Sequence, residues 1–210
     1  MSVRIHPSAI VEPGVELGTG TAIWDSSHIR APARIGRDCI IGEKTYIAYD
    51  VTVGDRVKIN AFVYICTGVT IEDGVMISAG TIFTNDRYPR ATTPDLLTLR
   101  SSEPDEFTEP TLVRAGATIG AGARIGPGLS IGRFAMVGMG AVVTRDVPDH
   151  AMVIGHPARM HAFVCRCGAP LLRLEAIEPT ASRHLECVRC GDTYFWNGNA
   201  LTLAIEAVLS

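Results

Sequence analysis

The stretch ARIGRDCIIGEKTYIAYDVTVGDRVKINAFVYICTGVTIEDGVMISAGTIF, residues 33–83, repeats a six-residue pattern. Isoleucine or valine returns at every sixth position, and a small or β-branched residue often stands two positions earlier. Neither an α-helix nor a flat sheet has this period. A fixed short period is typical of a solenoid, in which each repeat covers its apolar residue with its neighbours.

The same register extends in both directions from this stretch and is interrupted once, after Phe83. Its positions are Ile5, Val11, Leu17, Ile23, Ile29, Ile35, Ile41, Ile47, Val53, Ile59, Ile65, Ile71, Ile77 and Phe83, and then Val113, Ile119, Ile125, Ile131, Val137 and Val143. One repeating unit therefore accounts for most of the first 143 residues.

Each hexad predicts one short strand and one turn, and three hexads predict one triangular coil. The fold class is therefore all-β, a parallel β-helix whose axis is filled by the isoleucines and valines. With rungs about 4.8 Å apart, about twenty hexads make roughly seven coils and a prism about 30 Å long. Glycine, Asp or Asn at corners such as Gly14, Asp50 and Gly68 suits residues with positive φ or in tight turns.

Length and composition limit the alternatives. A chain of 210 residues allows one sizeable domain and a small appendage. The net charge of −3 gives no electrostatic case for nucleic-acid binding. The N-terminal residues lack the apolar run of a signal peptide, and no stretch reaches membrane-spanning length, so we expect a cytoplasmic protein. Its six cysteines should then be reduced, which favours a metal site over disulfides.

The first break in the repeat, from Thr84 to Pro110, carries no hexad pattern and several prolines. It must loop out from the prism, and long loops of this kind are usually functional or disordered. Its opening, TNDRYPR at residues 84–90, brings Asn, Asp, Tyr and two Arg together where the loop leaves the coil. A solvated insertion without a role is the alternative.

Two further breaks lie towards the C-terminus. In VVTRDVPDHAMVIGHPAR, residues 142–159, the hexads end in proline-containing turns. The tail, residues 161–210, then carries two cysteine pairs, each followed by glycine, and we expect a small zinc ribbon there. Cys165, Cys167, Cys187 and Cys190 predict a structural tetrahedral zinc site with four thiolates. Aromatic residues 194–196, the turn at Asn197 and residues 201–205 predict a hairpin beside the second pair.

The hexads, FTNDRYPR and the ending VVTRDVPDHAMVIGHPAR together resemble the left-handed β-helix acyltransferases of the hexapeptide-repeat family. Residues 1–160 resemble most the sugar N-acetyltransferases that acetylate the C3 amine of nucleotide-linked amino sugars, joined to dTDP or UDP. The resemblance implies a left-handed coil, a homotrimer, and acetyl-CoA in the cleft between adjacent prisms. Surface polysaccharide or glycoconjugate biosynthesis is the implied setting.

The resemblance also implies site residues. Asn85 matches the family position that holds the acceptor amine, and His28 matches a family motif near the substrate. Asp86 or His28 is then the candidate proton acceptor. Arg87 and Arg90 are candidates for binding the diphosphate of the nucleotide sugar, with Tyr88 between them as a further substrate-binding candidate.

Acetyl-CoA is expected along the glycine-rich coils and the closing turns. Gly120, Gly138 and Gly140 would let the pantetheine arm approach the backbone, although any one of these glycines serves a corner turn equally well. Arg145 and Arg159 are candidate partners of the CoA phosphates, with a solvated-surface role as the alternative.

An amine is a better acceptor than a hydroxyl for this sequence. Acetyl transfer from a thioester needs a neutral nucleophile, a stabilised oxyanion and close orientation. A hydroxyl needs a positioned base, often His, and the chain has none between Thr84 and Asp149. O-acetylation of a sugar or other small hydroxyl acceptor is therefore the runner-up. A γ-class carbonic anhydrase needs three His ligands, of which only His28 lies inside the repeat. A non-catalytic β-helix scaffold would explain the hexads without the loop.

Overall fold

The computed structural model describes residues 2–173, 182–198 and 200–204, and the described segments are strands joined by turns and one long loop. Strands stack in parallel, and within each uninterrupted run of hexads a strand pairs with the one 18 residues further along, as Lys58 pairs with Met76. Three hexads therefore form one coil, as the sequence predicts. In the described part of the chain no helix has the length and apolar character needed to cross a bilayer.

The coils have three faces, which we call the first, second and third face. The first face contains β1 (Arg4–Ile5), β4 (Ala22–Ile23), β7 (Ile40–Ile41), β10 (Lys58–Ile59), β13 (Met76–Ile77), β16 (Thr118–Ile119) and β19 (Met136–Val137). The second contains β2 (Ile10–Val11), β5 (His28–Ile29), β8 (Tyr46–Ile47), β11 (Tyr64–Ile65), β14 (Ile82–Phe83), β17 (Arg124–Ile125) and β20 (Val142–Val143). The third contains β3 (Glu16–Leu17), β6 (Ala33–Ile35), β9 (Val51–Val53), β12 (Val69–Ile71), β15 (Thr111–Val113) and β18 (Ser130–Ile131).

The hexad residues fill the axis of the prism. Ile29, Ile59 and Ile119 are fully buried, each packed between the coils before and after it. The exceptions belong to the first coil, which no coil precedes: Ile5 is 47% exposed, and Val11 and Leu17 are half-buried. Parallel stacking of three faces around an apolar axis agrees with the predicted β-helix, and the arrangement is consistent with the left-handed form.

The corners carry the predicted turn residues. Gly68 has φ 79° and Asp50 has φ 53°, both in the left-handed region. A residue with a Cβ is disfavoured in this region, while glycine, Asp and Asn tolerate it. The chain therefore turns between faces at the positions that the sequence marks.

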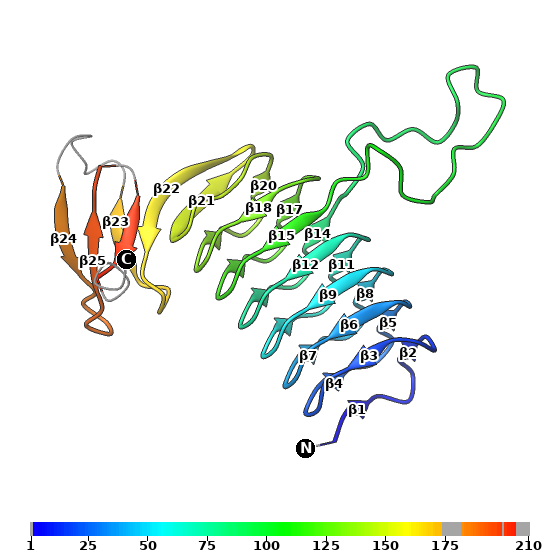
Figure 1. The fold of residues 1–210 in the computed structure, drawn as a ribbon, viewed down its shortest axis with the longest axis horizontal. Helices are drawn as coiled ribbons and strands as arrows, with labels where there is room; N and C mark the ends of the chain where they lie inside the picture. Colours follow the sequence, from blue (N-terminus) through cyan, green and yellow to red (C-terminus); the bar gives the residue numbers. More distant parts are fainter. Residues whose placement is uncertain (1, 174–181, 199, 205–210) are drawn as a thin grey trace.

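The long loop leaves the prism after Phe83 and returns at Thr111, matching the predicted bounds 84–110. It projects sideways from the coils (Figure 1). Isolated antiparallel bridges join Asp86 to Thr108 and Thr92 to Leu99 within it. The coils resume in register beyond it, because Val69 on β12 pairs with Thr111 on β15.

The last coil leads into the tail without a break in the sheet. β21 (Ala151–Gly155) and β22 (Ala158–Val164) form an antiparallel hairpin on the first face, and β23 (Pro170–Arg173) pairs with β22. The sequence predicts a domain boundary after residue 160, and β22 continues through that position. A separate three-stranded sheet follows, made of β24 (Arg183–Glu186), β25 (Thr193–Trp196) and β26 (Leu201–Leu203). The predicted hairpin is therefore present, except that residue 205 lies outside the described residues.

Candidate functional site

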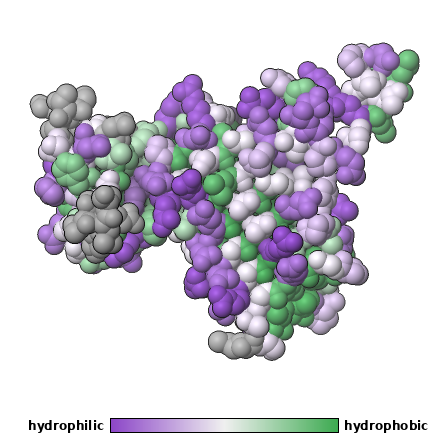
Figure 2. Space-filling model, viewed as in Figure 1, coloured by the Kyte–Doolittle hydropathy of each residue, from purple (hydrophilic) through white to green (hydrophobic). Residues whose placement is uncertain are grey.

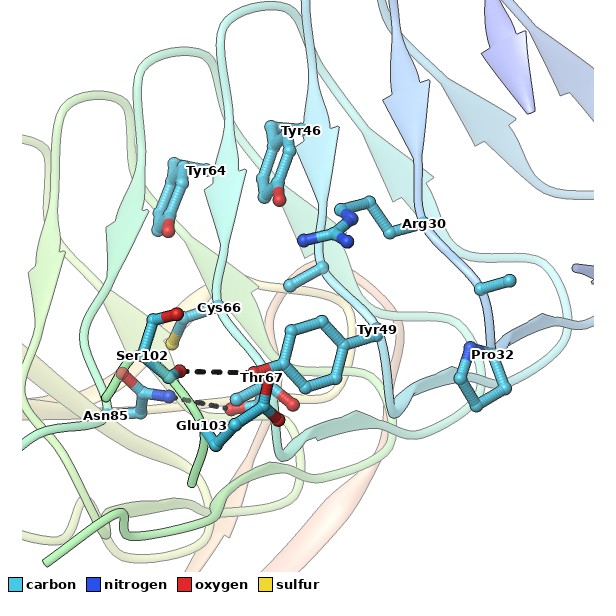
Figure 3. Close-up of a pocket in the computed structure, with 12 residues that line it drawn as sticks. Arg30, Pro32, Tyr46, Tyr49, Tyr64, Cys66, Thr67, Asn85, Ser102 and Glu103 are labelled. Atoms are coloured by element: carbon cyan, nitrogen blue, oxygen red, sulfur yellow. Dashed lines mark hydrogen bonds between the residues drawn. The ribbon is translucent and has the colours of Figure 1, made fainter. Parts of the chain in front are cut away.

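A cavity of about 540 Å³ opens at the corner between the second and third faces, where the long loop returns over the prism (Figure 3). The floor comes from the turns that follow three stacked strands of the second face, at Arg30, Ala48 and Cys66. The loop contributes Ser102 and Glu103. The Tyr49 hydroxyl donates to the Ser102 carbonyl across 3.5 Å, which joins the loop to the second turn.

Asn85 lies in this cavity. It stands two residues after the end of β14, so the last rung before the loop determines its position. Its side-chain Nδ2 donates to the Thr67 carbonyl at 3.3 Å, and its own carbonyl accepts from the Glu109 amide at 2.8 Å. Both ends of the loop thus meet at Asn85, and its side chain is held against the coil below.

His28 stands beside the cavity rather than in its lining. Its Nε2 lies 3.0 Å from Glu12 Oε1, and the Arg30 Nε donates to the same oxygen at 3.3 Å. The Ala31 amide donates to the second carboxylate oxygen at 3.0 Å. The pKa of Glu12 is lowered, mainly by the hydrogen bond from the Ala31 amide and next by the contact with His28. Glu12 is therefore a fixed carboxylate that holds both His28 and Arg30.

Two tyrosines continue the column that begins at His28. Tyr46 and Tyr64 are stacked at 5.2 Å with an interplanar angle of 6°, and His28 meets Tyr46 edge-on at 5.5 Å. Burial raises the pKa of the Tyr64 hydroxyl, so Tyr64 is neutral at physiological pH. Burial also raises the pKa of the Cys66 thiol to about 12, which leaves it uncharged.

The other predicted loop residues point to the loop itself. The Asp86 carboxylate accepts from the Tyr88 amide at 2.7 Å and lies 3.9 Å from Arg100. Arg87 pairs with Glu109 at 2.9 Å, and the Arg90 guanidinium donates to the Pro89 carbonyl at 2.9 Å. Tyr88 is 59% exposed against Phe107. None of these predicted residues lines the cavity among the described residues.

The predicted cofactor glycines divide into two kinds. A Cβ atom at Gly120 would lie 2.5 Å from the Met139 nitrogen, and one at Gly138 would lie 2.8 Å from Ile154 Cγ2. These two positions are glycine because stacked coils approach each other there. Gly140 has φ 66° and open space where a Cβ would stand. Arg145 is exposed just after β20.

Arg159 lies on β22 and donates to the neighbouring Ala158 carbonyl at 2.9 Å. It is exposed to solvent. The structure therefore brings Asn85 into the cavity with His28 beside it. The predicted CoA-phosphate candidates Arg145 and Arg159 lie past the last hexads, outside that cavity.

The four tail cysteines form one cluster, with all ligand atoms within 4.8 Å of one another. Cys165 Sγ lies 3.4 Å from Cys190 Sγ, and Cys167 Sγ lies 3.6 Å from Cys187 Sγ. Four thiolates about 2.3 Å from a tetrahedral zinc ion stand about 3.8 Å apart, so the cluster fits this ion. Backbone amides lower the pKa of Cys187 to about 7, whereas burial and the neighbouring thiols raise the pKa of Cys190 to about 12.

The sequence of these coils matches known repeat models. A model described as bacterial transferase hexapeptide (six repeats) covers residues 50–85. A second, described as hexapeptide repeat of succinyl-transferase, covers residues 32–66 and 113–145. These coils therefore carry hexapeptide repeats similar to those of bacterial transferases.

Individual relatives match shorter parts of this hexapeptide-repeat chain. The dTDP-3-amino-3,6-dideoxy-alpha-D-galactopyranose 3-N-acetyltransferase of Aneurinibacillus thermoaerophilus is 42% identical over 68 residues, which are 32% of this chain and 35% of the relative. The acyl-[acyl-carrier-protein]--UDP-N-acetylglucosamine O-acyltransferase of Brucella ovis is 54% identical over 35 residues, 17% of this chain and 13% of the relative. The chain thus spans about a third or less of the curated relatives it matches.

Two solved structures match this chain over about three quarters of its length, each with a TM-score below 0.5. PerB from Caulobacter crescentus, in complex with CoA and GDP-perosamine, is 27% identical with a TM-score of 0.44, covering 77% of this chain and 58% of PerB. A mutant form of AntD from Bacillus cereus, in complex with dTDP and Coenzyme A, is 18% identical with a TM-score of 0.47, covering 78% of this chain and 82% of AntD.

Sequence reasoning missed several residues around the cavity of this hexapeptide-repeat protein, chiefly Tyr46, Tyr64, Arg30 and Glu12. A signal for two of them was present. His28, Tyr46 and Tyr64 stand one coil apart, each directly before a hexad isoleucine, and residues at this spacing form a column on one face. Reading the chain with the period of the coil as well as that of the hexad finds them.

Proposed function

We propose that this chain is an acetyl-CoA-dependent N-acetyltransferase acting on the C3 amine of a nucleotide-linked amino sugar. The observation that carries this proposal is the cavity beneath the long loop, in which Asn85 is fixed at the end of the last coil before the loop. The 42% identity with a dTDP-linked 3-amino-sugar 3-N-acetyltransferase supports the acceptor class.

The reaction joins the amine nitrogen to the acetyl carbonyl carbon and breaks the bond from that carbon to the CoA sulfur. Asn85 orients the neutral amine by a hydrogen bond, which lowers the entropic part of the barrier. The proton that the nitrogen loses ends on the departing CoA thiol, directly or through water. No histidine lies among the described lining residues, which favours an amine over a hydroxyl acceptor.

We expect acetyl-CoA to lie along the corner between the first and second faces. Gly80, Gly122 and Gly140 form that corner one above another, and no side chain stands on any of them. A pantetheine arm reaches backbone amides there without meeting a Cβ. Arg145 and Arg159 remain our candidates for the CoA phosphates.

A homotrimer completes the proposed site. The outward column of the first face includes Ile40, Met76, Met136 and Met152 beside Arg4, Lys58 and Thr118. That of the second face includes Ile10, Tyr46, Tyr64, Ile82 and Val142 beside His28 and Arg124. That of the third face includes Glu16, Arg34, Thr52, Thr70 and Ser130 beside Leu112. Two mainly apolar faces and one mainly polar face suit a prism that contacts two neighbours and exposes its third side to water. Figure 2 shows apolar surface over the N-terminal coils and at the end of the loop.

The cysteine cluster is proposed to hold one structural zinc ion. The ion would fix the two turns at Cys165 and Cys187, and the Arg166–Asp192 pair at 2.6 Å lies against this cluster. With four protein ligands no coordination position is left for a substrate, so the zinc takes no part in acetyl transfer. We place the chain in the cytoplasm, where its thiols stay reduced.

The test is a screen of the purified protein with acetyl-CoA and a panel of dTDP- and UDP-linked 3-amino, 4-amino and 3-hydroxy sugars, read by mass spectrometry. We expect a single acetyl group on a 3-amino sugar and release of free CoA thiol. Acetylation of the 3-hydroxy sugar alone would replace the proposal by an O-acetyltransferase. No acetylation anywhere in the panel would overturn it.

A further inference from the structure

One wall of the cavity is built from hydrogen-bond donors. Arg30, Tyr46 and Tyr64 stand side by side on the second face, and both tyrosine hydroxyls point the same way, towards Arg30 and Cys66 (Figure 3). Arg30 is the only cationic residue among the described residues that line the cavity. All three belong to the regular coils rather than to the loop.

The Arg30 guanidinium is held in place before any ligand arrives. Its Nε donates to Glu12 at 3.3 Å, and its central carbon lies 5.4 Å from the Tyr49 ring centre. Guanidinium has five donor hydrogens in a rigid fork, and Glu12 uses the one on Nε. The other four lie on the terminal nitrogens, which reach further into the cavity.

The Tyr46 hydroxyl lies close enough to this guanidinium to raise the pKa of Arg30. Because guanidinium has no acceptor, the Tyr46 oxygen can only accept from it. The Tyr46 hydroxyl proton can be donated to a further acceptor. Tyr64, stacked 5.2 Å away, presents a second hydroxyl in the same direction. The wall therefore offers one cation and two hydroxyl donors to a single neighbouring group.

Ligand chemistry follows from this arrangement. A guanidinium flanked by hydroxyl donors suits an oxyanion with several acceptor oxygens, either phosphate or carboxylate. The opposite side of the cavity carries Asn85, the Thr67 turn and the Glu103 carboxylate of the loop (Figure 3). The cavity is therefore cationic at Arg30 and anionic at Glu103. An acceptor that carries an anionic group at one end and an amine at the other matches this arrangement.

We propose that Arg30, assisted by the Tyr46 and Tyr64 hydroxyls, binds the anionic group of the acceptor, in the first instance the diphosphate of a nucleotide-linked sugar. This inference rests on the proposed function. It assigns to Arg30 the role that the sequence suggests for Arg87 and Arg90, whose guanidinium groups bond to Glu109 and to the Pro89 carbonyl. Glu12 is then a positioning residue that sets the direction of the guanidinium.

The test is isothermal titration of the full chain with dTDP and UDP, compared with thymidine and uridine. Arg30→Gln should weaken binding of the preferred nucleoside diphosphate about tenfold or more, because it removes charge-assisted hydrogen bonds. Arg34→Gln is the matched control, since Arg34 lies on the polar third face at 70% side-chain exposure. Binding of the nucleosides should not change in either variant.

A second variant tests the wall without altering its charge. Tyr46→Phe combined with Tyr64→Phe keeps the stacked rings and removes both hydroxyls. This double variant should weaken binding of the diphosphate several-fold. Thermal melts by circular dichroism show whether each variant is folded. If Arg30→Gln is unfolded, the double variant decides. Diphosphate affinity equal to wild type in the folded variants would overturn the inference, as would a wild-type protein that binds the nucleosides as tightly as the diphosphates.

Glucuronate as a competing ligand separates the two sources of an oxyanion. Competition by glucuronate that Arg30→Gln abolishes, without any effect on the diphosphates, assigns the wall to a sugar carboxylate instead. The acetylation screen is independent of these titrations. Diphosphate binding that depends on Arg30 without any acetyl transfer supports this inference and overturns the proposed function. Acetyl transfer whose KM for the acceptor is unchanged in Arg30→Gln supports the proposed function and overturns this inference.

Discussion

The Asn85 side-chain nitrogen donates to the backbone carbonyl of Thr67, one coil away, across 3.3 Å. An amide held by its nitrogen turns its oxygen the other way. That oxygen accepts hydrogen bonds only, so it fits the N–H of an acceptor amine and not a second acceptor. The coil thus selects which atom of Asn85 meets the substrate, because the stacking of one turn on the next fixes both partners.

Replacing Asn85 by alanine should reduce kcat for the amino sugar about tenfold to a hundredfold, the effect of removing one well-placed hydrogen bond. Acetyl-CoA binding should stay within about twofold, because the contact is with the acceptor. Steady-state kinetics and titration of CoA measure the two effects separately.

Asp86→Asn is the paired control for Asn85→Ala. The Asp86 carboxylate accepts a hydrogen bond from the Tyr88 amide within the loop. Its replacement should therefore reduce activity only by making the loop less ordered. A loss of kcat as large as that of Asn85→Ala, with acetyl-CoA binding intact, would return the proton-acceptor role to Asp86. A near-normal kcat in Asn85→Ala would remove Asn85 from the site.

The hexad period contains enough information to predict the coils, the bounds of the loop and the corner residues. Each coil depends on its neighbours through the same few contacts, so a local pattern determines a long-range structure. Phe83 and Thr111 mark the ends of the loop because the register of buried residues stops at one and resumes at the other. The cysteine spacing likewise predicts a cluster that the structure brings within 4.8 Å.

The cavity itself could be predicted only in part. Asn85 stands two residues after the hexad residue Phe83, so its place on the prism was predictable. The side-chain directions of Arg87 and Arg90 depend on how the loop folds on itself, and the loop has no repeat from which to read them. Glu12 and Arg30 come together because they stand 18 residues apart, one coil above the other. Glu103 reaches the cavity through the return of a loop whose path no period specifies.

Self-association should depend on the first face. Ile40 is 42% exposed on that face, and Ile40→Glu places a charge where we expect a neighbouring prism to pack. Sedimentation velocity should show the wild type as a trimer and this variant as smaller species. Thr52→Glu, at the exposed centre of β9 on the polar third face, is the matched control and should remain trimeric. Equal sedimentation of all three proteins would contradict our assignment of this face.

Metal analysis tests the tail. The wild type should contain about one zinc ion per chain. Cys187→Ser should lose this ion, because a site of four thiolates loses most of its affinity for zinc when one ligand is removed. Cys39→Ala, which removes a cysteine buried in the prism, should keep its zinc. Full zinc content in Cys187→Ser would exclude Cys187 from the ligand set.

The cysteine variant also separates the tail from the prism. Without metal, limited proteolysis should cut residues 161–210 while the coils up to about residue 143 resist, since stacked hexads hold one another without help from the cysteine cluster. Loss of protection throughout the chain would show that β22 and β23 transmit unfolding into the last coil.

Glu12 should make the N-terminal coils sensitive to acid. Its pKa is lowered in the folded chain, first by the Ala31 amide and then by His28, so its ionised form is the one that stabilises the fold. A group with a lowered pKa contributes stability above its ordinary pKa and loses it as the pH falls through the folded value. Wild type should therefore melt higher than Glu12→Gln at pH 7, and the difference should shrink as the pH falls below about 4.

Glu16→Gln is the comparison for this pH series. Glu16 pairs with Arg34 at 3.4 Å on the third face, but both side chains are 70% exposed, and exposed pairs contribute little. Its melting temperature should follow wild type at every pH. The Glu12 effect is specific because one carboxylate serves three donors on the coil above it: His28, Arg30 and the Ala31 amide. A constant difference between wild type and Glu12→Gln from pH 7 to about 3 would show that the pKa of Glu12 is the same in the folded and unfolded chains, so that its ionised form does not stabilise the fold.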